Sequence, residues 1–334
     1  MVFVAGIIGS ELAPTKSLST LPVATIVVGT ALSVIPVIRL MSIFGRKKVF
    51  LSACIYSILL IGLCIFSITK EIFFLFSFAS FCLGASVATM MQFRFAAIES
   101  VNLEQRASAT AVVLLGGLIS AFLGTEIATI GKNILETDFA GSFLLLALLF
   151  IIAFVLMIFF EPATKFKEHK DKSKRPLIDI TTQGSFIVAV SAATTGYVVM
   201  SFIMTATPVS MHVMDGHSLH HTKLVLQSHV IAMFLPSLFT AYVVKYIGLT
   251  RMMLIGILFL FVSVLIAFMS HALTNYWWSL VLLGLGWNFL FIGGTNLLPQ
   301  AYNENEKFKV QSINDFLVFG FQAFAALSAG WFVF

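Results

Sequence analysis

Long apolar runs, separated by short polar segments, follow one another along most of the chain. Each run is about 20 residues or more, whereas the strands of a membrane barrel give alternating segments of about ten residues. A helix of about 20 residues rises about 30 Å, which matches the hydrocarbon thickness of a bilayer. The pattern therefore predicts an all-α membrane protein with ten transmembrane helices, over 21–43, 49–68, 72–93, 107–131, 140–160, 184–210, 221–247, 252–270, 276–298 and 311–334.

Composition supports the same class. Apolar residues make up 59% of the 334 residues and charged residues 10%, and the mean hydropathy is +1.01. A water-soluble domain carries about 25% charged residues, so these values exclude that class. The three cysteines lie inside predicted spans, where a thiol acts as a small apolar group and says nothing about redox compartment.

The basic residues predict which side of the membrane each loop faces. If the loop at 44–48 is cytoplasmic, alternate loops and the adjoining helix ends collect all but four of the 20 Lys and Arg residues. The four exceptions are Lys16, Lys70, Lys132 and Lys223. Because basic residues concentrate in cytoplasmic loops, this topology accounts for the net charge of +5 without a nucleic-acid partner. It places the loop at 211–220 outside.

A histidine-rich stretch, residues 211–229, holds five of the seven histidines. His221 and His229 are eight residues apart, about 12 Å along a helix, whereas zinc binds its histidine nitrogens at about 2.0 to 2.1 Å. The loop histidines with Asp215 match zinc-ligand spacing only in part, without a thiol or buried carboxylate. We predict a hydrated outer turn with Ser218 as the N-cap of the next helix, and no metal site.

Two halves of similar pattern are joined by a charged segment. Residues 161–178 contain Pro near both ends and no apolar period, which predicts a flexible cytoplasmic linker between helical bundles at 1–160 and 179–334. Glycine motifs recur in the two halves at offsets of 203, 200 and 204, and pair Gly45 with Gly248, Gly84 with Gly284 and Gly116 with Gly320. Near-equal offsets indicate a duplicated bundle, an arrangement typical of transporters with a midplane solute site.

These features resemble the major facilitator superfamily over essentially the whole chain: the basic loop "GRKK", the duplicated halves and the charged linker. The strings "GIIGSELAPTKSLSTLPVATIVVGTALSVIP", "QFRFAAIES", "GLGWNFLFIGGTNLLPQAY" and "VQSINDFLVFG" are similar to the subfamily that includes bacterial riboflavin transporters. The resemblance implies a two-bundle, twelve-helix secondary transporter of the bacterial inner membrane. It would move a small solute by alternating access, without nucleotide hydrolysis, and would work as a monomer.

The chain departs from the family pattern in three places. Ser42 stands where the loop motif usually carries Asp, and Thr125 with Glu126 stands where proton-coupled drug exporters generally have Gly-Pro. Both departures weaken the drug-exporter interpretation. Against the family pattern, residues 1–10 are the outer end of helix 1 and Phe334 closes helix 11, so the resemblance implies that the chain is truncated at both ends, with a partial first helix and no helix 12.

Polar residues inside the predicted spans are candidates for solute binding, because polar groups are expensive in hydrocarbon. His229 lies about two turns into its helix with Gln227 before it, and the subfamily resemblance places Q-x-H here. A neutral imidazole offers one donor and one acceptor. A histidine satisfied by a neighbouring helix is the alternative.

The stretch "LLGLGWNFLFIGGTNLLPQ" carries the strongest pocket signal. Its candidate residues are Trp287, Asn288, Phe291, Thr295 and Asn296. Aromatic faces stack on a planar solute such as an isoalloxazine ring, and amides hydrogen-bond its edges. Tyr197 is a similar candidate from the seventh family helix. Ordinary aromatic packing and small-residue helix contacts are the alternative.

Charged residues near the inner ends of spans predict a gating network, formed by Arg46, Arg94, Glu99, Arg106, Arg251 and Asp315. Ordinary snorkelling of long side chains toward water explains the same positions. Glu126 is a candidate for proton coupling, and a place among lipid headgroups is its alternative.

Three functions remain open. The first is transport of a small organic solute such as riboflavin or a related planar vitamin; the second is drug or metabolite export; the third is a truncated, non-transporting membrane protein. An enzyme is not expected, because no HExxH or Gly-x-Ser-x-Gly motif is found. The expected partners are a small-molecule solute and the lipid bilayer, and no cofactor is expected.

Overall fold

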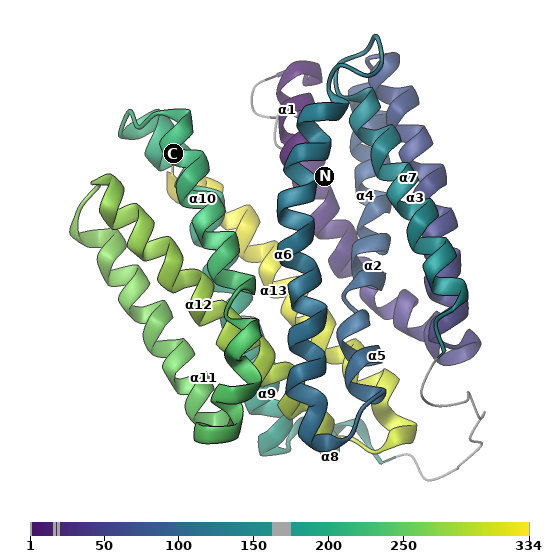
Figure 1. Cartoon of the computed structure of the whole chain (residues 1–334), viewed down its shortest axis with the longest axis vertical. Coiled ribbons are helices and arrows are strands. Elements are labelled where there is room, and N and C mark those ends of the chain that lie inside the picture. The colour runs from purple at the N-terminus through teal and green to yellow at the C-terminus, as the bar shows by residue number, and fades with distance from the viewer. Residues whose placement is uncertain (1, 16–17, 19–20, 162–174, 334) are drawn as a thin grey trace. The chain divides into compact units, whose positions relative to one another are not determined.

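The structure is a computed structural model that describes residues 2–15, 18, 21–161 and 175–333 (Figure 1). Every regular element within these residues is a helix, which confirms the all-α class. The α-helices are α1 (Val2–Leu12), α2 (Leu21–Phe44), α3 (Arg46–Thr69), α4 (Phe73–Met90), α5 (Phe93–Glu99), α6 (Arg106–Gly131), α7 (Ala140–Ile158), α8 (Leu177–Thr181), α9 (Gly184–Val209), α10 (Leu219–Phe234), α11 (Ser237–Met269), α12 (Leu273–Leu297) and α13 (Lys307–Val333). Short 3₁₀ turns η2 (Leu103–Gln105), η4 (Leu298–Gln300) and η5 (Glu304–Glu306) and a π turn η3 (Ser210–Met214) connect them.

Seven helical segments of the described chain are long and apolar enough to cross a membrane. They are α2, α3, α4 with α5, α7, most of α9, α11, and α12 with η4. Helices α6 and α13 also coincide with predicted spans, at 107–131 and 311–334, and α10 covers the first half of the predicted span at 221–247. The count of ten spans stays a prediction. Most of the predicted linker, 162–174, lies outside the described residues.

The predicted span at 221–247 is divided in the structure. Helix α10 ends at Phe234, and α11 begins at Ser237 after Pro236. Proline has no backbone N–H and its ring clashes with the preceding turn, so one unbroken helix across this position is disfavoured. The predicted boundary between 247 and 252 is present inside α11, because Gly248 is non-helical (φ 79°, ψ 164°).

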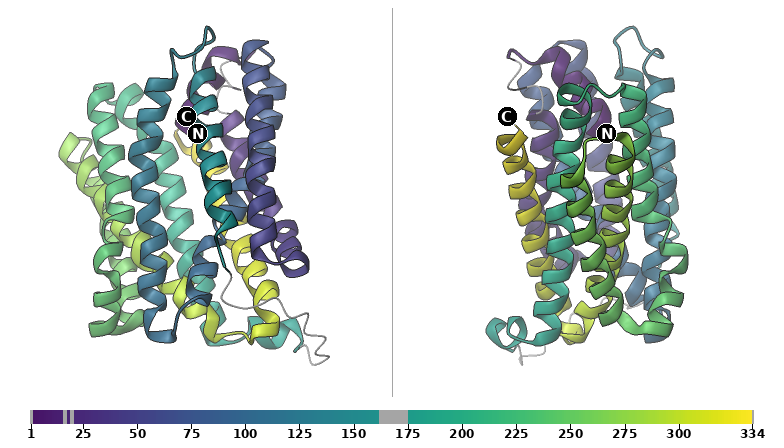
Figure 2. Two further views of the ribbon diagram at one scale, coloured as in Figure 1. Left: turned by 45° about the vertical axis from the view of Figure 1, so that its right-hand side comes forward. Right: turned by 90° about the vertical axis from the view of Figure 1, so that its left-hand side faces the viewer.

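The first compact unit comprises residues 1–96 and 120–167. Within it α2 packs against α4, and α3 packs against α7 as well as α4, with α3 and α7 side by side in Figures 1 and 2. Its apolar core is contributed by six helices and a loop, through residues that include Ile8, Ile26, Ile61, Phe76, Ala128, Phe139 and Phe143. A buried hydroxyl pair, Ser57 with Ser86 at 2.7 Å, joins α3 to α4.

The second compact unit comprises residues 97–119 and 168–334. Residues 97–119, which the sequence pattern assigns to the first bundle, are grouped here with the second. Within this unit α12 packs against α9, α10 and α11, and α13 packs against α9. The side-by-side pair α11 and α12 is visible in Figure 1. All aromatic solute-binding candidates and His229 belong to this unit.

Two of the three paired glycine motifs have matching geometry in the two units. Gly45 (φ 82°) and Gly248 (φ 79°) adopt the same positive-φ conformation, which side chains disfavour, so the same turn follows α2 and interrupts α11. Gly84 of α4 and Gly284 of α12 each allow a close helix crossing. A Cβ at Gly84 would lie 2.4 Å from backbone atoms of α2, and a Cβ at Gly284 would lie 2.7 Å from the carbonyl oxygen of His229 on α10.

Candidate functional site

His229 is fully buried on α10 and faces α12. Its Nδ1 lies 2.8 Å from the carbonyl oxygen of Leu280. A carbonyl oxygen only accepts hydrogen bonds, so Nδ1 carries the proton, and in the neutral ring Nε2 is left as an acceptor. Nε2 is buried and has no protein partner among the described residues. Gln227 is half-buried, and a separation of two residues on a helix sends the two side chains in different directions.

Aromatic side chains from four helices meet around Tyr197 and Trp287. The Tyr197 ring of α9 makes edge contacts with Trp287, Phe291 and Phe319, each at 5.4 Å between ring centroids. Trp287 and Phe291 of α12 are stacked at 4.8 Å with 18° between their planes. Phe234 of α10 meets Trp287 at 5.8 Å. This aromatic cluster therefore contains three predicted residues, together with Phe234 and Phe319, which sequence reasoning did not select.

The indole N–H of Trp287 is a polar group inside this aromatic cluster. The Trp287 side chain is 2% exposed, and its Nε1 has no protein partner among the described residues. An indole N–H can only donate, and a buried donor without an acceptor is costly. Trp287 and His229 thus present one donor and one acceptor whose hydrogen bonds the described residues do not complete.

The two asparagines of α12 differ in their environments. Asn288 is fully buried and donates to the carbonyl oxygen of Met233 (2.7 Å) and to Ser237 Oγ (2.8 Å). Its Oδ1 accepts from Thr240 at 3.3 Å, so its amide is used in joining α12 to α10 and α11.

Asn296 donates to Ile292 O (2.9 Å) and Thr110 Oγ1 (3.3 Å), and its buried Oδ1 has no protein partner among the described residues. Asn296 lies nine residues beyond Trp287, which is half a turn around a helix, so the two side chains leave α12 in opposite directions. Thr295 is buried one turn after Phe291.

A network of charged and polar side chains lies where α12 passes into α13. Glu99 accepts hydrogen bonds from Lys307 Nζ (3.4 Å) and Gln311 Nε2 (3.1 Å), and Lys307 also pairs with Glu304. Arg175 binds both oxygens of Glu306, at 2.9 and 2.6 Å. Of these residues only Glu99 was predicted. A single sequence gives no signal for the others, because an ion pair between residues 175 and 306 depends on the fold.

The Arg175 guanidinium lowers the pKa of Glu306 to about 2, mainly through its hydrogen bonds to the carboxylate. The backbone N–H of Asn303 adds a bond of 2.9 Å to the same group. Glu306 is 5% exposed and Arg175 is 37% exposed. The pair fixes the chain just before α8 to the turn before α13.

The other predicted gating residues are spread over both units. Arg46 is buried and its Nη1 lies 3.6 Å from Met41 Sδ, and Arg94 stacks on the Phe95 ring at 4.6 Å. Asp315 is fully buried and accepts a hydrogen bond from Asn314 at 2.7 Å.

Three remaining charged candidates occupy helix surfaces or ends. Arg106 begins α6 and is half-buried, while Arg251 in α11 is exposed. Glu126 is exposed on α6.

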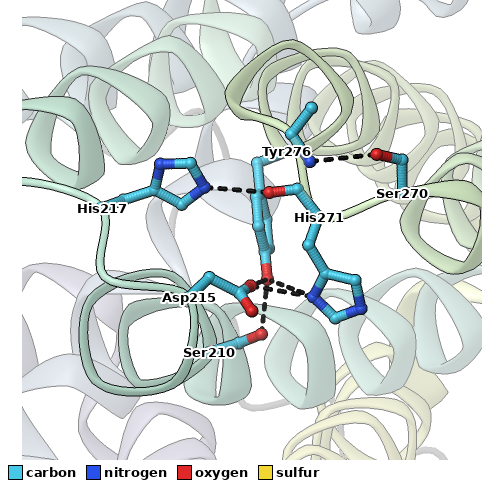
Figure 3. A network of polar contacts seen from close by, with 7 residues as sticks. Ser210, Asp215, His217, Ser270, His271 and Tyr276 are labelled. Atoms are coloured by element: carbon cyan, nitrogen blue, oxygen red, sulfur yellow. Dashed lines mark hydrogen bonds and ion pairs between the residues drawn. The ribbon is translucent and has the colours of Figure 1, made fainter.

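The loop after α9 forms a polar cluster with the turn before α12 and with Tyr276 in the first turn of α12 (Figure 3). The carboxylate of Asp215 accepts from Tyr276 (2.5 Å) and contacts His271 Nδ1 (2.8 Å), while His217 Nε2 lies 2.9 Å from the carbonyl oxygen of His271. The Tyr276 hydrogen bond is the largest cause of a lowered Asp215 pKa, and His271 contributes further.

The start of α10 bears out the predicted cap. The Ser218 side chain accepts from the backbone N–H of His221 at 3.1 Å, which is the expected N-cap hydrogen bond. The described part of the chain contains no group of three or more His, Cys, Asp or Glu residues that could hold a metal ion. The side chain of His212 lies outside the described set.

Comparison with protein families identifies the chain. Residues 1–327 match the family model described as Major Facilitator Superfamily. The chain belongs to this superfamily. It is accordingly a multi-pass membrane protein of the superfamily's transporter type.

Among superfamily proteins, the chain is 33% identical to the riboflavin transporter RfnT of Brucella anthropi, an alignment that covers 99% of this chain and 83% of the relative. It is 31% identical to the uncharacterized MFS-type transporter YdeG of Bacillus subtilis, over 95% of this chain and 77% of the relative. Both relatives are aligned with nearly the whole of the present sequence.

Solved superfamily structures share the fold. The Escherichia coli fucose:proton symporter FucP aligns with a TM-score of 0.67 at 14% identity, over 99% of this chain and 83% of that one. The human organic anion transporter MFSD10 aligns with a TM-score of 0.66 at 14% identity, over 99% and 84%. At such low identity these likenesses concern the fold alone.

Proposed function

We propose that the chain is a secondary transporter that carries riboflavin or a related planar vitamin across a bacterial cytoplasmic membrane by alternating access. One observation carries the proposal: His229 Nε2 and Trp287 Nε1 are buried at 0% and 2% side-chain exposure and lack protein partners among the described residues. The 33% identity to a riboflavin transporter supports flavin as the solute.

The chemistry of the second unit suits a flat, polar-edged ring. Tyr197, Trp287 and Phe291 supply aromatic faces, and aromatic groups favour stacked or edge contacts with planar rings. His229 Nε2 accepts from a ligand N–H or O–H, and Trp287 Nε1 donates to a ligand oxygen. Polar groups inside a bilayer are expensive unless they have a partner, and a bound solute would provide one.

Asn288 is the candidate with the strongest packing role. Its amide hydrogen bonds are all made within the protein, so we assign it to helix packing and keep Asn296 as a solute-binding candidate. Glu126 stays the proposed site of proton coupling, and the charged segment 161–178 is proposed to face the cytoplasm, in accordance with the distribution of basic residues. We propose that the transporter acts as a monomer.

Uptake of labelled riboflavin by a riboflavin-auxotrophic bacterium that expresses the chain tests the proposal. We expect uptake by the wild type and its loss in His229→Ala and Trp287→Ala. Trp278→Phe is the matched control, because Trp278 is 53% exposed and lies in the same helix. Unchanged uptake in both site variants would refute the site. Absence of riboflavin uptake together with increased dye resistance would refute the vitamin assignment in favour of export.

A further inference from the structure

Thr194 in the middle of α9 departs from the usual behaviour of helical threonines. Threonine hydroxyls inside helices commonly donate to the carbonyl oxygen four residues earlier. Two others on α9 do so: Thr205 bonds Ser201 O at 2.7 Å, and Thr207 bonds Ile203 O at 2.8 Å. The hydroxyl of Thr194 is buried and has no protein partner among the described residues.

The hydroxyl belongs to the same stretch of α9 that contacts Trp287. Thr194 precedes Tyr197 by three residues, so the two are neighbours on the helix surface. A Cβ on Gly196 would lie 3.6 Å from Trp287 Cδ1, the indole carbon that is bonded to Nε1. The edge of the indole that carries this N–H is therefore close to the face of α9 on which Gly196 lies, and Tyr197 contacts the same ring at 5.4 Å. Thr194 leaves the helix about 60° from Tyr197, on the side away from Gly196.

The Trp287 N–H and the Thr194 hydroxyl differ in the hydrogen bonds that they can form. The indole N–H only donates, and the threonine hydroxyl donates or accepts. A carbonyl oxygen has two lone pairs and accepts hydrogen bonds. A planar heterocycle with carbonyl groups on its edge therefore offers acceptors to donors that lie around an aromatic cluster. Tyr197 and Phe291 provide the ring contacts beside them.

We propose that Thr194 is a solute-contact residue that donates its hydroxyl hydrogen to a carbonyl oxygen on the edge of the transported heterocycle, beside the Tyr197 ring. The inference rests on the proposed function, and names which edge of the solute faces α9. It assigns selectivity to this edge, because a buried donor left without an acceptor discriminates strongly against an analogue that lacks the oxygen.

Equilibrium binding measured by quenching of flavin fluorescence on the purified full chain tests this role. Thr194→Val removes the hydroxyl at nearly constant volume, and we expect the Kd for riboflavin to rise about tenfold. Thr194→Ser keeps the hydroxyl and should bind within about twofold of the wild type. Thr205→Val is the control, because that hydroxyl is already bonded to its own helix.

A second measurement compares riboflavin with its 2-thio and 4-thio analogues, in which sulfur replaces one ring carbonyl oxygen and is a weaker acceptor. The wild type should discriminate against at least one of them, and Thr194→Val should lose much of that discrimination. A purely structural threonine would change all three affinities equally. Should Thr194→Val fail to fold, Thr194→Ala removes the hydroxyl without adding an apolar group.

The possible results separate the two proposals. If the wild type binds riboflavin, and Thr194→Val binds it equally well with unchanged discrimination, the role of Thr194 is refuted while the proposed function stands. If the wild type does not bind riboflavin, the proposed function fails and this inference fails with it. Weaker binding and reduced discrimination in Thr194→Val, with normal Thr205→Val, supports both.

Discussion

Replacement of Glu306 by Gln isolates the contribution of the ion pair between Arg175 and the turn before α13. On folding, the pKa of Glu306 falls from its ordinary 4.5 to about 2 because Arg175 stabilises the carboxylate. For a pair fully shielded from solvent, this fall in pKa corresponds to about 3 kcal/mol of folding stability at neutral pH. Since Arg175 is 37% exposed, solvent screening reduces our expectation to about 1 to 2 kcal/mol.

The pH dependence has a definite sign. A carboxyl group whose pKa is lowered in the folded state stabilises fully above its unfolded pKa, here 4.5, and the stabilisation is lost as pH falls toward about 2. Thermal unfolding of the detergent-purified chain between pH 2 and 7 should therefore show a lower Tm for Glu306→Gln at neutral pH. The difference from the wild type should shrink as the pH approaches 2.

Asp138→Asn is the matched control. This change removes the ion pair between Asp138 and Lys132, whose side chains are 56% and 45% exposed. Ion pairs this exposed contribute little to stability. We expect a smaller change in Tm than for Glu306→Gln. A Glu306→Gln variant with the stability of the wild type at pH 7, or a difference that grows on acidification, would contradict the reasoning.

Three further changes test other parts of the structure. Gly248→Ala should lower the free energy of unfolding by about 1 to 3 kcal/mol in denaturant titrations, because alanine disfavours φ 79°. Gly62→Ala is the control and should not destabilise, because Gly62 lies within helix α3 and a Cβ there would meet no atom within 4 Å. Asn288→Ala should destabilise by about 1 to 3 kcal/mol and leave the riboflavin Kd within about twofold, so a large selective loss of binding would argue against a packing role. Asp215→Asn weakens the acceptor for Tyr276 and should lower Tm slightly at pH 7, with a difference from the wild type that diminishes in acid. An unchanged Tm at pH 7 would mean that the hydrogen bonds of Asp215 add no stability.

The sequence by itself determined the class of the protein and its repeated architecture. Runs of about 20 apolar residues can satisfy their backbone groups in lipid only as helices, so the helical class follows from composition and length. Gly45 and Gly248 could be paired from spacing alone, since a positive φ demands glycine locally and leaves a mark in the sequence. The Ser218 cap was predictable for the same reason, because an N-cap acts within one helical turn.

The four-residue spacing of Trp287 and Phe291 also places them on one face of a helix, and their rings stack in the structure. Helical periodicity could not select Phe234 or Phe319, because their contacts with the cluster depend on how α10 and α13 pack against their neighbours. In the sequence of an apolar helix, an aromatic residue that faces lipid cannot be distinguished from one that faces a binding site.

Only the tertiary structure decided which polar groups are already satisfied. Asn288 and Asn296 look alike in the sequence, yet one completes its hydrogen bonds across a helix contact and the other leaves its Oδ1 unpaired. Thr194 and Thr205 differ in the same way on α9. The physical reason is that a hydrogen bond requires its partner within about 3 Å, and in a bundle that partner comes from a helix far away in the chain.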